Sequence, residues 1–243
     1  AHAYLISSAL TGFTGILLVL GNRRRGIRLT RRNAFILTTV SWIISSAFAA
    51  LPFMLSTIQL GFSDAYFEAV SGLTTTGSTI LTGLEQLPHG ILLWRGRLQW
   101  LGGIGIVVMA VSIMTFLQIG GMHLIQTEFS DRSEKVSPRP AQFGRALVLV
   151  YLILSFACVL LYWHAGMSGF DAIVHAMTTI STGGFSNYDT SLAHFTGPAV
   201  ILVAILFMIL GSLPFVMYIR MLRGDFQQLW KAGQARTFLV ILL

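Results

Sequence analysis

The stretch LTTTGST, residues 73–79, is small, rich in hydroxyl groups and built around one glycine, in a chain that is otherwise largely apolar. A second stretch, ISTGGFS at residues 180–186, aligns with it without a gap at a spacing of 107 residues. In this register Asp64 aligns with Asp171, and Gly77 aligns with Gly184. Internal repeats decide an architecture, so we expect two structural units of one plan, each organised around its glycine loop.

The composition excludes a soluble globular domain. Apolar residues make up 54% of the chain and charged residues 10%, against the roughly 25% that is usual for soluble domains. Asp, Glu, Lys and Arg are absent from five stretches, each long enough to cross a hydrocarbon core with about 20 helical residues. These stretches are 1–22, 33–63, 98–127, 146–170 and 190–219. We therefore predict an all-α integral membrane protein with spans at 3–20, 34–56, 98–118, 143–164 and 195–219.

The basic residues indicate the orientation of the chain in the membrane. The net charge is +7, and 14 of the 16 Lys and Arg lie in three clusters, at 23–32, 132–145 and 220–236. The positive-inside rule makes these clusters cytoplasmic, which places both glycine loops on the outside. The first cluster can also bind anionic lipid, although its role in setting the orientation is enough to explain it. Clustering in loops between spans does not indicate a nucleic-acid partner.

Arg95 and Arg97 lie outside the three basic clusters. Trp94 and Trp100 stand beside them, and tryptophan is enriched where a membrane meets water. We expect these four residues to form an interfacial anchor in a loop, residues 80–96, that leads back to the surface.

Two segments between the spans are too short to cross the membrane. Residues 64–73 and 171–181 are each about ten residues long, and ten helical residues cover about 15 Å, half a hydrocarbon core. Each should enter from outside, stop midway and return through its glycine loop. Asp64 and Asp171 are expected to cap these pore half-helices, and cation attraction at the pore mouth is their alternative role. The partly negative carboxyl end of each half-helix favours a cation at the membrane centre.

The two glycine loops carry the chemistry of a cation filter. A cation gives up its hydration water only when oxygen atoms replace it, and inward-pointing backbone carbonyls can do so. Glycine permits the backbone angles that this needs and leaves no side chain in the way. Neither loop holds a carboxylate, so a strong divalent site is not indicated. An ordinary interhelical turn is the plain alternative, and the repeat argues against it.

Three motifs carry a resemblance to a known family: FEAVSGLTTTG at 67–77, WLGGIG at 100–105 and STGGFS at 181–186. The chain resembles the membrane subunit of bacterial Trk-type potassium uptake systems, in the Trk/Ktr/HKT superfamily, from about Arg32 onward. This implies a potassium-channel-like pore of four repeats, each a span, a pore half-helix, a filter loop and a span. It also implies a transporter and not an enzyme, in a bacterial inner membrane. Homodimers and a nucleotide-binding ring subunit of TrkA type are implied as partners.

The resemblance also implies site residues. Gly77 and Gly184 correspond to the filter glycines of the first two repeats, and glycine rather than serine at Gly77 favours potassium over sodium. The implied potassium ligands are the backbone carbonyl oxygens of Thr75, Thr76, Thr182 and Gly183. No prosthetic group is implied, and coupling to protons or sodium stays open.

The expected organisation has four parts. A transmembrane helix with its basic loop (1–32) precedes a first pore repeat (33–130) and a second one (131–225), which run parallel to each other. A cytoplasmic segment and the start of a further span follow at 226–243. Two repeats instead of four favour a truncated chain, although two copies of a natural half-size protein could also make one pore.

Two other function classes stay open. A cation-coupled secondary solute transporter built on broken helices is the main alternative, but such proteins commonly have inverted repeats, whereas these two are expected to be parallel. A non-conducting membrane scaffold would leave the repeated loops unexplained. His175 aligns with Glu68, and packing with a hydrogen bond is expected there in preference to a proton relay. Gly102 to Gly105 are expected to pack closely against a helix.

Overall fold

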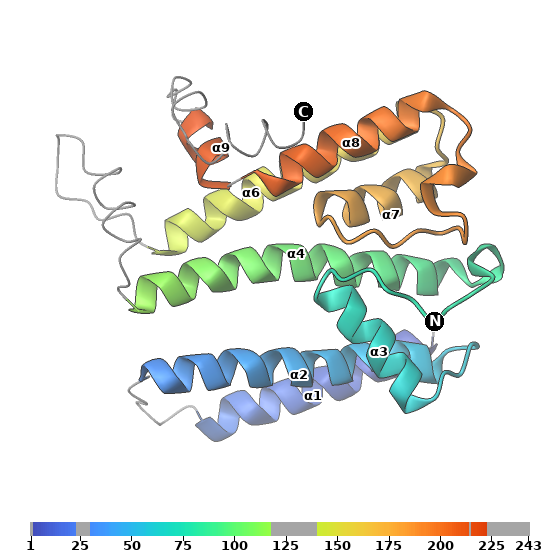
Figure 1. Cartoon of the computed structure of the whole chain (residues 1–243). Coiled ribbons are helices and arrows are strands. Elements are labelled where there is room, and N and C mark those ends of the chain that lie inside the picture. The colour runs from blue at the N-terminus through green and yellow to red at the C-terminus, as the bar shows by residue number, and fades with distance from the viewer. Residues whose placement is uncertain (1, 23–29, 118–139, 214, 223–243) are drawn as a thin grey trace. The chain divides into compact units, whose positions relative to one another are not determined.

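The computed structural model describes residues 2–22, 30–117, 140–213 and 215–222. These residues form α-helices, two short 3-10 helices and loops, and none of them lies in a strand, which confirms the all-α prediction (Figure 1). The elements are α1 (His2–Asn22), α2 (Arg31–Leu55), α3 (Phe62–Leu73), η1 (Leu84–Gln86), α4 (His89–Leu117), α6 (Pro140–His164), α7 (Gly169–Ile180), η2 (Ser191–His194), α8 (Pro198–Ser212) and α9 (Phe215–Leu222).

The chain folds as two compact units that are interleaved in the sequence. The first unit comprises residues 1–103 together with 183–194, and the second comprises 104–182 together with 195–243. The loop that follows α7 therefore belongs to the first unit from Gly183 onward. The predicted repeat boundaries at residues 130 and 225 lie outside the described residues.

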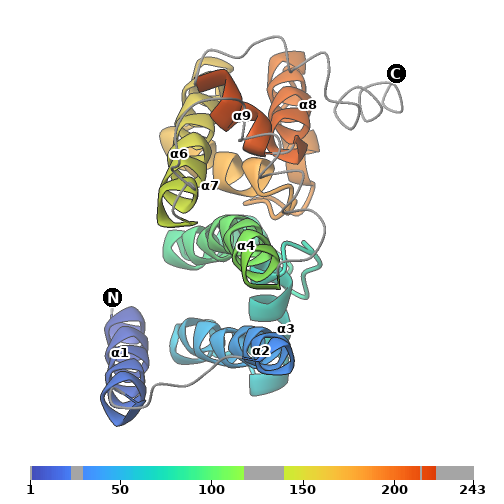
Figure 2. The ribbon, with the colours of Figure 1, turned by 90° about the vertical axis from the view of Figure 1, so that its left-hand side faces the viewer.

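In the first unit, α1 runs alongside α2, and α3 packs obliquely against α2 (Figures 1 and 2). The contact between α2 and α3 consists of alanines and the ring of Phe53, and two residues of α4 complete the core. The buried core comprises Ala49, Ala50, Phe53, Ala65, Ala69, Ile91 and Leu98. Alanine pairs let the two helix backbones approach closely, and this holds the short helix α3 in place.

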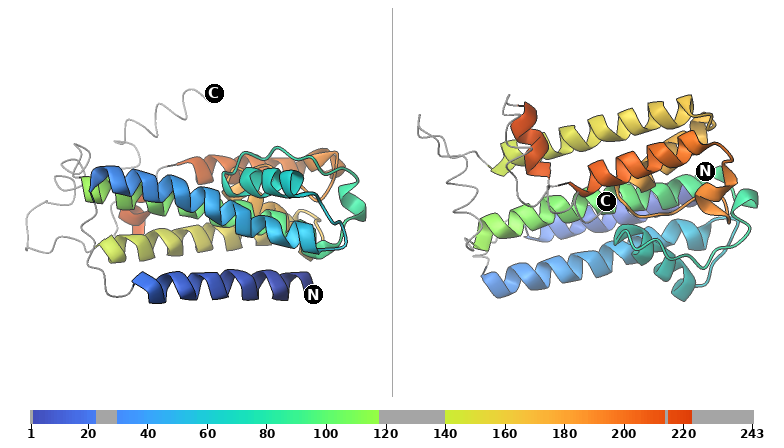
Figure 3. Two further views of the ribbon diagram at one scale, coloured as in Figure 1. Left: turned by 90° about the horizontal axis from the view of Figure 1, so that it is seen from below. Right: turned by 45° about the horizontal axis from the view of Figure 1, so that its top comes forward.

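In the second unit, α7 packs against both α6 and α8, and α6 runs alongside α8 (Figure 3). Ser168 caps α7, because its side chain accepts a hydrogen bond from the backbone N–H of Asp171. Pro198 stands in the first turn of α8, where its missing N–H costs nothing. The span predicted over 195–219 is divided into two helices, because α8 ends at Ser212 and α9 begins at Phe215.

Several helices have the length and apolar surface of membrane spans. Among the described residues three qualify, at His2–Asn22, Phe35–Leu55 and Gly144–His164, and α8 is a shorter apolar helix. Large apolar side chains of α1 face outward, among them Leu5, Phe13 and Val19. Such a surface suits lipid rather than water, and these three helices coincide with three of the five predicted spans.

Helix α4 begins earlier than predicted. The sequence predicts a loop over residues 80–96 and a span from residue 98, but the helix begins at His89. Pro88 stands just before this start, and its carbonyl oxygen accepts a hydrogen bond from the backbone N–H of Ile91. Proline is favoured at helix starts because its fixed φ suits a helix and its missing N–H costs nothing there. Arg95 therefore lies nearly two turns inside α4.

Candidate functional site

The first glycine loop leaves α3 by a sharp change of backbone direction. Thr74 closes the helix with φ −82° and ψ 2°, and its hydroxyl donates a hydrogen bond of 2.8 Å to the carbonyl of Val70. Thr75 then has φ 55° and Gly77 has φ 79°, both in the left-handed region. A threonine rarely adopts a positive φ, because its Cβ crowds the backbone there. The loop is therefore held in a conformation that costs free energy.

The second glycine loop has the same local backbone. Ser181 closes α7 with φ −78° and ψ −3°, and its hydroxyl donates a hydrogen bond of 2.9 Å to the carbonyl of Met177. Thr182 has φ 52° and Gly184 has φ 81°. Each of these residues stands 107 positions after its counterpart in the first loop. Two threonines share an unfavourable conformation at matched positions, which indicates one common structural requirement.

Part of the second loop lies against the first loop within the first unit. A Cβ atom added to Gly77 would overlap the carbonyl oxygen of Gly183. A Cβ added to Gly184 would meet no atom within 4 Å. The structure therefore brings Gly77 and Gly183 together, and the absence of a side chain at Gly77 is what allows this contact.

An amide side chain from α4 holds the second loop at two points. The Nε2 atom of Gln99 donates a hydrogen bond of 2.8 Å to the carbonyl oxygen of Gly183, and its Oε1 atom accepts one of 3.1 Å from the N–H of Phe185. These two contacts bracket Gly184. Gln99 is completely buried, so its amide is committed to the loop rather than to solvent.

A buried ion pair lies beside Gln99. The Nε atom of Arg95 donates to Oε1 of Glu68 at 2.7 Å, with the two side chains 1% and 0% exposed. The Nη1 atom of Arg95 donates to the carbonyl oxygen of Ser186 at 2.9 Å, and the guanidinium carbon lies 4.2 Å from the centroid of the Phe185 ring. The predicted interfacial anchor is therefore wrong for Arg95, because α4 directs this side chain into the protein. Arg97 is exposed.

Trp94, the residue before Arg95, makes contacts within the first unit. Its indole N–H donates a hydrogen bond of 3.0 Å to the carbonyl of Ala49 in α2, and its ring packs edge-on against Tyr4 of α1. The tryptophan thus joins three helices of the first unit.

Glu68 connects the ion pair to the first loop. Its two carboxylate oxygens accept hydrogen bonds of 2.9 and 3.0 Å from the hydroxyl of Thr79, and one of them accepts from the N–H of Ile80 at 3.3 Å. The ion pair therefore contacts residues shortly after Gly77 and shortly after Gly184.

A carboxylate links the outer parts of the two loops. Asp189 accepts hydrogen bonds of 2.7 Å from the N–H of Gly83 and 3.0 Å from the N–H of Leu84, at the start of η1. In return, the N–H of Asp189 donates to the carboxylate of Glu85 at 3.0 Å. Asp189 thus caps a short helix that lies more than 100 residues before it in the chain.

Residues 2–241 match the family model of TrkH, described as a cation transport protein. The chain belongs to the TrkH family. That family consists of transporters, which agrees with the prediction that the chain is not an enzyme.

Two relatives of this TrkH-family chain are both named Trk system potassium uptake proteins. It is 48% identical over 210 residues to a Trk system potassium uptake protein TrkI from Halomonas elongata, covering 86% of this chain and 43% of that protein. It is 39% identical to a Trk system potassium uptake protein TrkH from Salmonella typhimurium, covering 94% of this chain and 48% of that protein. The chain thus spans about half the length of these relatives.

A solved structure of the TrkH family has the same fold. The crystal structure of the potassium transporter TrkH from Vibrio parahaemolyticus superposes with a TM-score of 0.87 at 34% sequence identity. The superposition covers 98% of this chain and 49% of that one.

The two predicted cap residues of this TrkH-family chain are not N-caps. The helix α3 begins at Phe62 with Gly61 as its N-cap, and α7 begins at Gly169 with Ser168 as its N-cap. Asp64 and Asp171 therefore stand in the first helical turns, where a carboxylate still interacts favourably with the helix dipole. Asp171 additionally accepts a hydrogen bond of 2.7 Å from the hydroxyl of Ser168.

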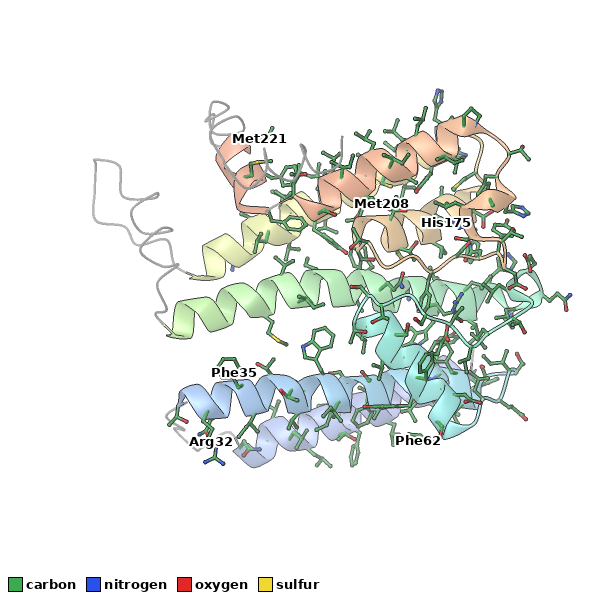
Figure 4. All side chains as sticks on the ribbon, in the orientation of Figure 1. Arg32, Phe35, Phe62, His175, Met208 and Met221 are labelled. Carbon is green, nitrogen blue, oxygen red and sulfur yellow. The ribbon has the colours of Figure 1, made fainter. Side chains whose placement is uncertain are left out.

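His175 is packed and hydrogen-bonded, as expected. Its Nδ1 atom lies 2.9 Å from the carbonyl oxygen of Asp171, and Phe195 packs edge-on against its ring. Figure 4 shows His175 on the short helix α7. Among the residues that the structure describes, no group of His, Cys, Asp and Glu could hold a metal ion.

Four polar residues that hold the loops were not predicted as site residues, namely Glu68, Arg95, Gln99 and Asp189. For Glu68 and Arg95 the sequence contains a signal. Glu68 lies in a segment expected at membrane depth, and a carboxylate there needs a partner of opposite charge. Arg95 was the nearest basic residue outside the three clusters.

Proposed function

We propose that this TrkH-family chain forms part of a potassium-selective pore in a Trk-type potassium uptake system. The glycine loops act as two segments of its selectivity filter. Gly77 and Gly184 are the filter glycines, and the carbonyl oxygens of Thr75, Thr76, Thr182 and Gly183 replace water around the ion. One observation carries the proposal: both loops place a threonine and a glycine in left-handed backbone at aligned positions. In the first loop φ is 55° at Thr75 and 79° at Gly77, and in the second it is 52° at Thr182 and 81° at Gly184.

The proposed pore consists of repeats. Helices α2, α3 and α4 with their glycine loop are the first repeat, and α6, α7 and α8 with theirs are the second. Both repeats run from the cytoplasmic side to the outside and back, as two of the four that such a pore needs. A close contact at the end of each half-helix supports this reading. A Cβ on Gly102 would overlap the carbonyl of Leu73, the last residue of α3, and a Cβ on Gly211 would lie 2.6 Å from the carbonyl oxygen of Ile180, the last residue of α7.

The loop chemistry suits a weakly bound monovalent ion. The residues from Thr74 to Thr79 and from Ser181 to Ser186 contain hydroxyl and carbonyl oxygens but no carboxylate. Carbonyl dipoles bind a potassium ion strongly enough to replace water and weakly enough to let it leave. Thr76, Thr182 and Gly184 are exposed residues within the part of the chain that the structure describes.

The proposal includes location, orientation and partners. The protein lies in a bacterial inner membrane with its basic loops in the cytoplasm and its glycine loops toward the outside. Arg32 at the start of α2 and Phe62 at the start of α3 lie at opposite ends of the first unit, which supports this orientation (Figure 4). A homodimer, surrounding lipid and a cytoplasmic nucleotide-binding ring subunit of TrkA type complete the proposed assembly.

The test is ion flux through the full-length protein in liposomes. Potassium flux should exceed sodium flux, and Gly77→Ser should reduce that preference, because a side chain at residue 77 displaces the Gly183 carbonyl. Gly184→Ser should be measured beside it. An unchanged preference in both variants would refute the filter assignment. Flux of neither ion in the unmodified protein would favour the cation-coupled solute transporter.

A further inference from the structure

We propose that Arg95 and Gln99 of α4, together with Glu68 of α3, are positioning residues that set the conformation of both glycine loops and thereby the cation selectivity. We call these three residues the loop clamp. The inference rests on the proposed filter function and extends it to side chains that never touch the ion.

Gln99 acts on a proposed ligand atom directly. Its amide donates to the carbonyl oxygen of Gly183, and a carbonyl oxygen has two lone pairs, so one remains for a cation. The second contact, from the N–H of Phe185 to Oε1, fixes the other side of Gly184. Gly184 has a positive φ and open space where a Cβ would stand, so no side chain of its own restrains it. Gln99 supplies that restraint from both sides.

Arg95 fixes the next residue of the same loop. Its guanidinium donates to the Ser186 carbonyl and lies over the Phe185 ring, while its Nε atom is paired with Glu68. The planar guanidinium offers donors in fixed directions, so the positions of Glu68 and Ser186 are linked through one rigid group. The residues from Gly183 to Ser186 are thus held by two side chains of α4, one helical turn apart.

Glu68 extends the same restraint to the first loop. The carboxylate that pairs with Arg95 also accepts hydrogen bonds from Thr79 and Ile80. One continuous set of buried contacts therefore runs from the residues after Gly77 to the residues after Gly184. A shift of the first loop changes the second through this set, because a packed polar network does not deform freely.

The decisive variants alter the clamp without altering either loop sequence. Gln99→Met keeps the length and volume of the side chain and removes both loop contacts, and Gln86→Met makes the same change at an exposed position on η1. Arg95→Lys keeps a positive charge for Glu68 and loses the rigid fork, and Arg97→Lys is its exposed control two residues away. Each variant is made in the full-length protein and reconstituted at equal amounts of assembled protein, judged by size-exclusion chromatography.

The readout is the ratio of potassium to sodium flux. Gln99→Met and Arg95→Lys should lower this ratio by roughly 2-fold to 10-fold, which corresponds to the loss of a hydrogen bond of ordinary strength. The two controls should keep the ratio of the unmodified protein. A residue that merely supports folding would change the yield of assembled protein and leave the ratio unaltered.

The outcomes separate this inference from the proposed function. If the unmodified protein does not prefer potassium, the filter proposal fails, and the clamp inference fails with it. If the unmodified protein prefers potassium and Gly77→Ser lowers that preference while Gln99→Met and Arg95→Lys do not, only the clamp inference is overturned. Failure of both clamp variants to assemble, with both controls assembling, would assign these residues to folding and also overturn it.

Discussion

At the scale of single residues, Gly77 and Gly184 have the same backbone conformation and different surroundings. Both have φ near 80°, where a residue with a Cβ is strained by about 1–2 kcal/mol. At Gly77 the added Cβ would also overlap the carbonyl of Gly183, whereas the described residues leave open space at Gly184. Two glycines with one proposed role should therefore differ in their tolerance of substitution.

Alanine substitution tests this difference. Gly77→Ala should strongly reduce the preference for potassium, because the methyl group and the Gly183 carbonyl cannot occupy the same place. Gly184→Ala should retain measurable selective flux, reduced by the backbone strain alone. The measurement is the potassium-to-sodium flux ratio of both variants beside the unmodified protein. Equal effects of the two substitutions would show that φ strain, and not the contact with Gly183, decides the outcome.

The buried pair of Glu68 and Arg95 leads to a second prediction at this scale. Removing one partner leaves the other charge buried without compensation, which typically costs about 3–5 kcal/mol. Glu68→Gln and Arg95→Met should each lower the melting temperature strongly, and the double variant should be less destabilised than the sum of the two. Thermal unfolding in detergent measures all three. Additive effects would indicate that the two side chains are not energetically coupled.

At the scale of elements, the last carbonyl group of each short helix, α3 and α7, lies against a glycine of the next long helix, α4 or α8. Gly102 of α4 lies against the last carbonyl of α3, as its place in a run of small residues predicted. In contrast, Gly15 of α1 has no atom within 4 Å of its Cβ position. Glycine is therefore required for close packing at Gly102, whereas no packing contact requires it at Gly15.

A matched pair of substitutions tests this role. Gly102→Ala should prevent assembly or lower the melting temperature sharply, because backbone atoms of Leu73 cannot move away as a flexible side chain would. Gly15→Ala should be neutral or slightly stabilising, since alanine is the better helix former by about 1 kcal/mol. The yield of folded protein and its melting temperature measure both. A harmless Gly102→Ala would mean that α3 and α4 do not pack as described.

Asp189 provides another prediction at the level of elements. Because its carboxylate caps η1 from a distant part of the chain, Asp189→Ala should free the N–H groups of Gly83 and Leu84. Hydrogen exchange at these two residues should accelerate by about 10-fold, the effect of losing one charge-assisted hydrogen bond. Asp64→Ala, in the first turn of α3, is a control that should not change exchange at η1. Unaltered exchange in Asp189→Ala would show that the cap contributes nothing.

At the scale of the whole molecule, orientation can be tested by cysteine labelling. The chain has one cysteine, Cys158, which is buried and should give little background. Gln86→Cys, on η1, should react with a membrane-impermeant maleimide added to intact cells. Arg32→Cys, at the start of α2, should react only after the membrane is permeabilised. The reverse pattern would invert the proposed topology.

The sequence predicted the all-helical fold and the two short helices, but it did not predict the polar contacts inside the first unit. The two half-helices appear within two residues of their predicted starts, because glycine loops and hydrophobic patterning are local signals. Arg95 was misplaced because the sequence shows a charge but not its partner. Glu68 lies 27 residues before it and Ser186 lies 91 residues after it. The sequence predicted one span over 195–219 where α8 and α9 are separate helices, because an apolar run does not show whether a proline inside it bends a helix or ends it.

The interleaved units also have a consequence for biogenesis. Residues 183–194 complete the first unit, although the ribosome makes them only after α6 and α7. At about 5–20 residues per second, Arg95 precedes its Ser186 acceptor by on the order of ten seconds. In that interval Glu68 is already present to pair with Nε, but water, lipid headgroups or the insertion machinery must satisfy the Nη1 group, because an unpaired polar group in hydrocarbon costs several kcal/mol. Maturation of the first unit therefore waits for synthesis of most of the second.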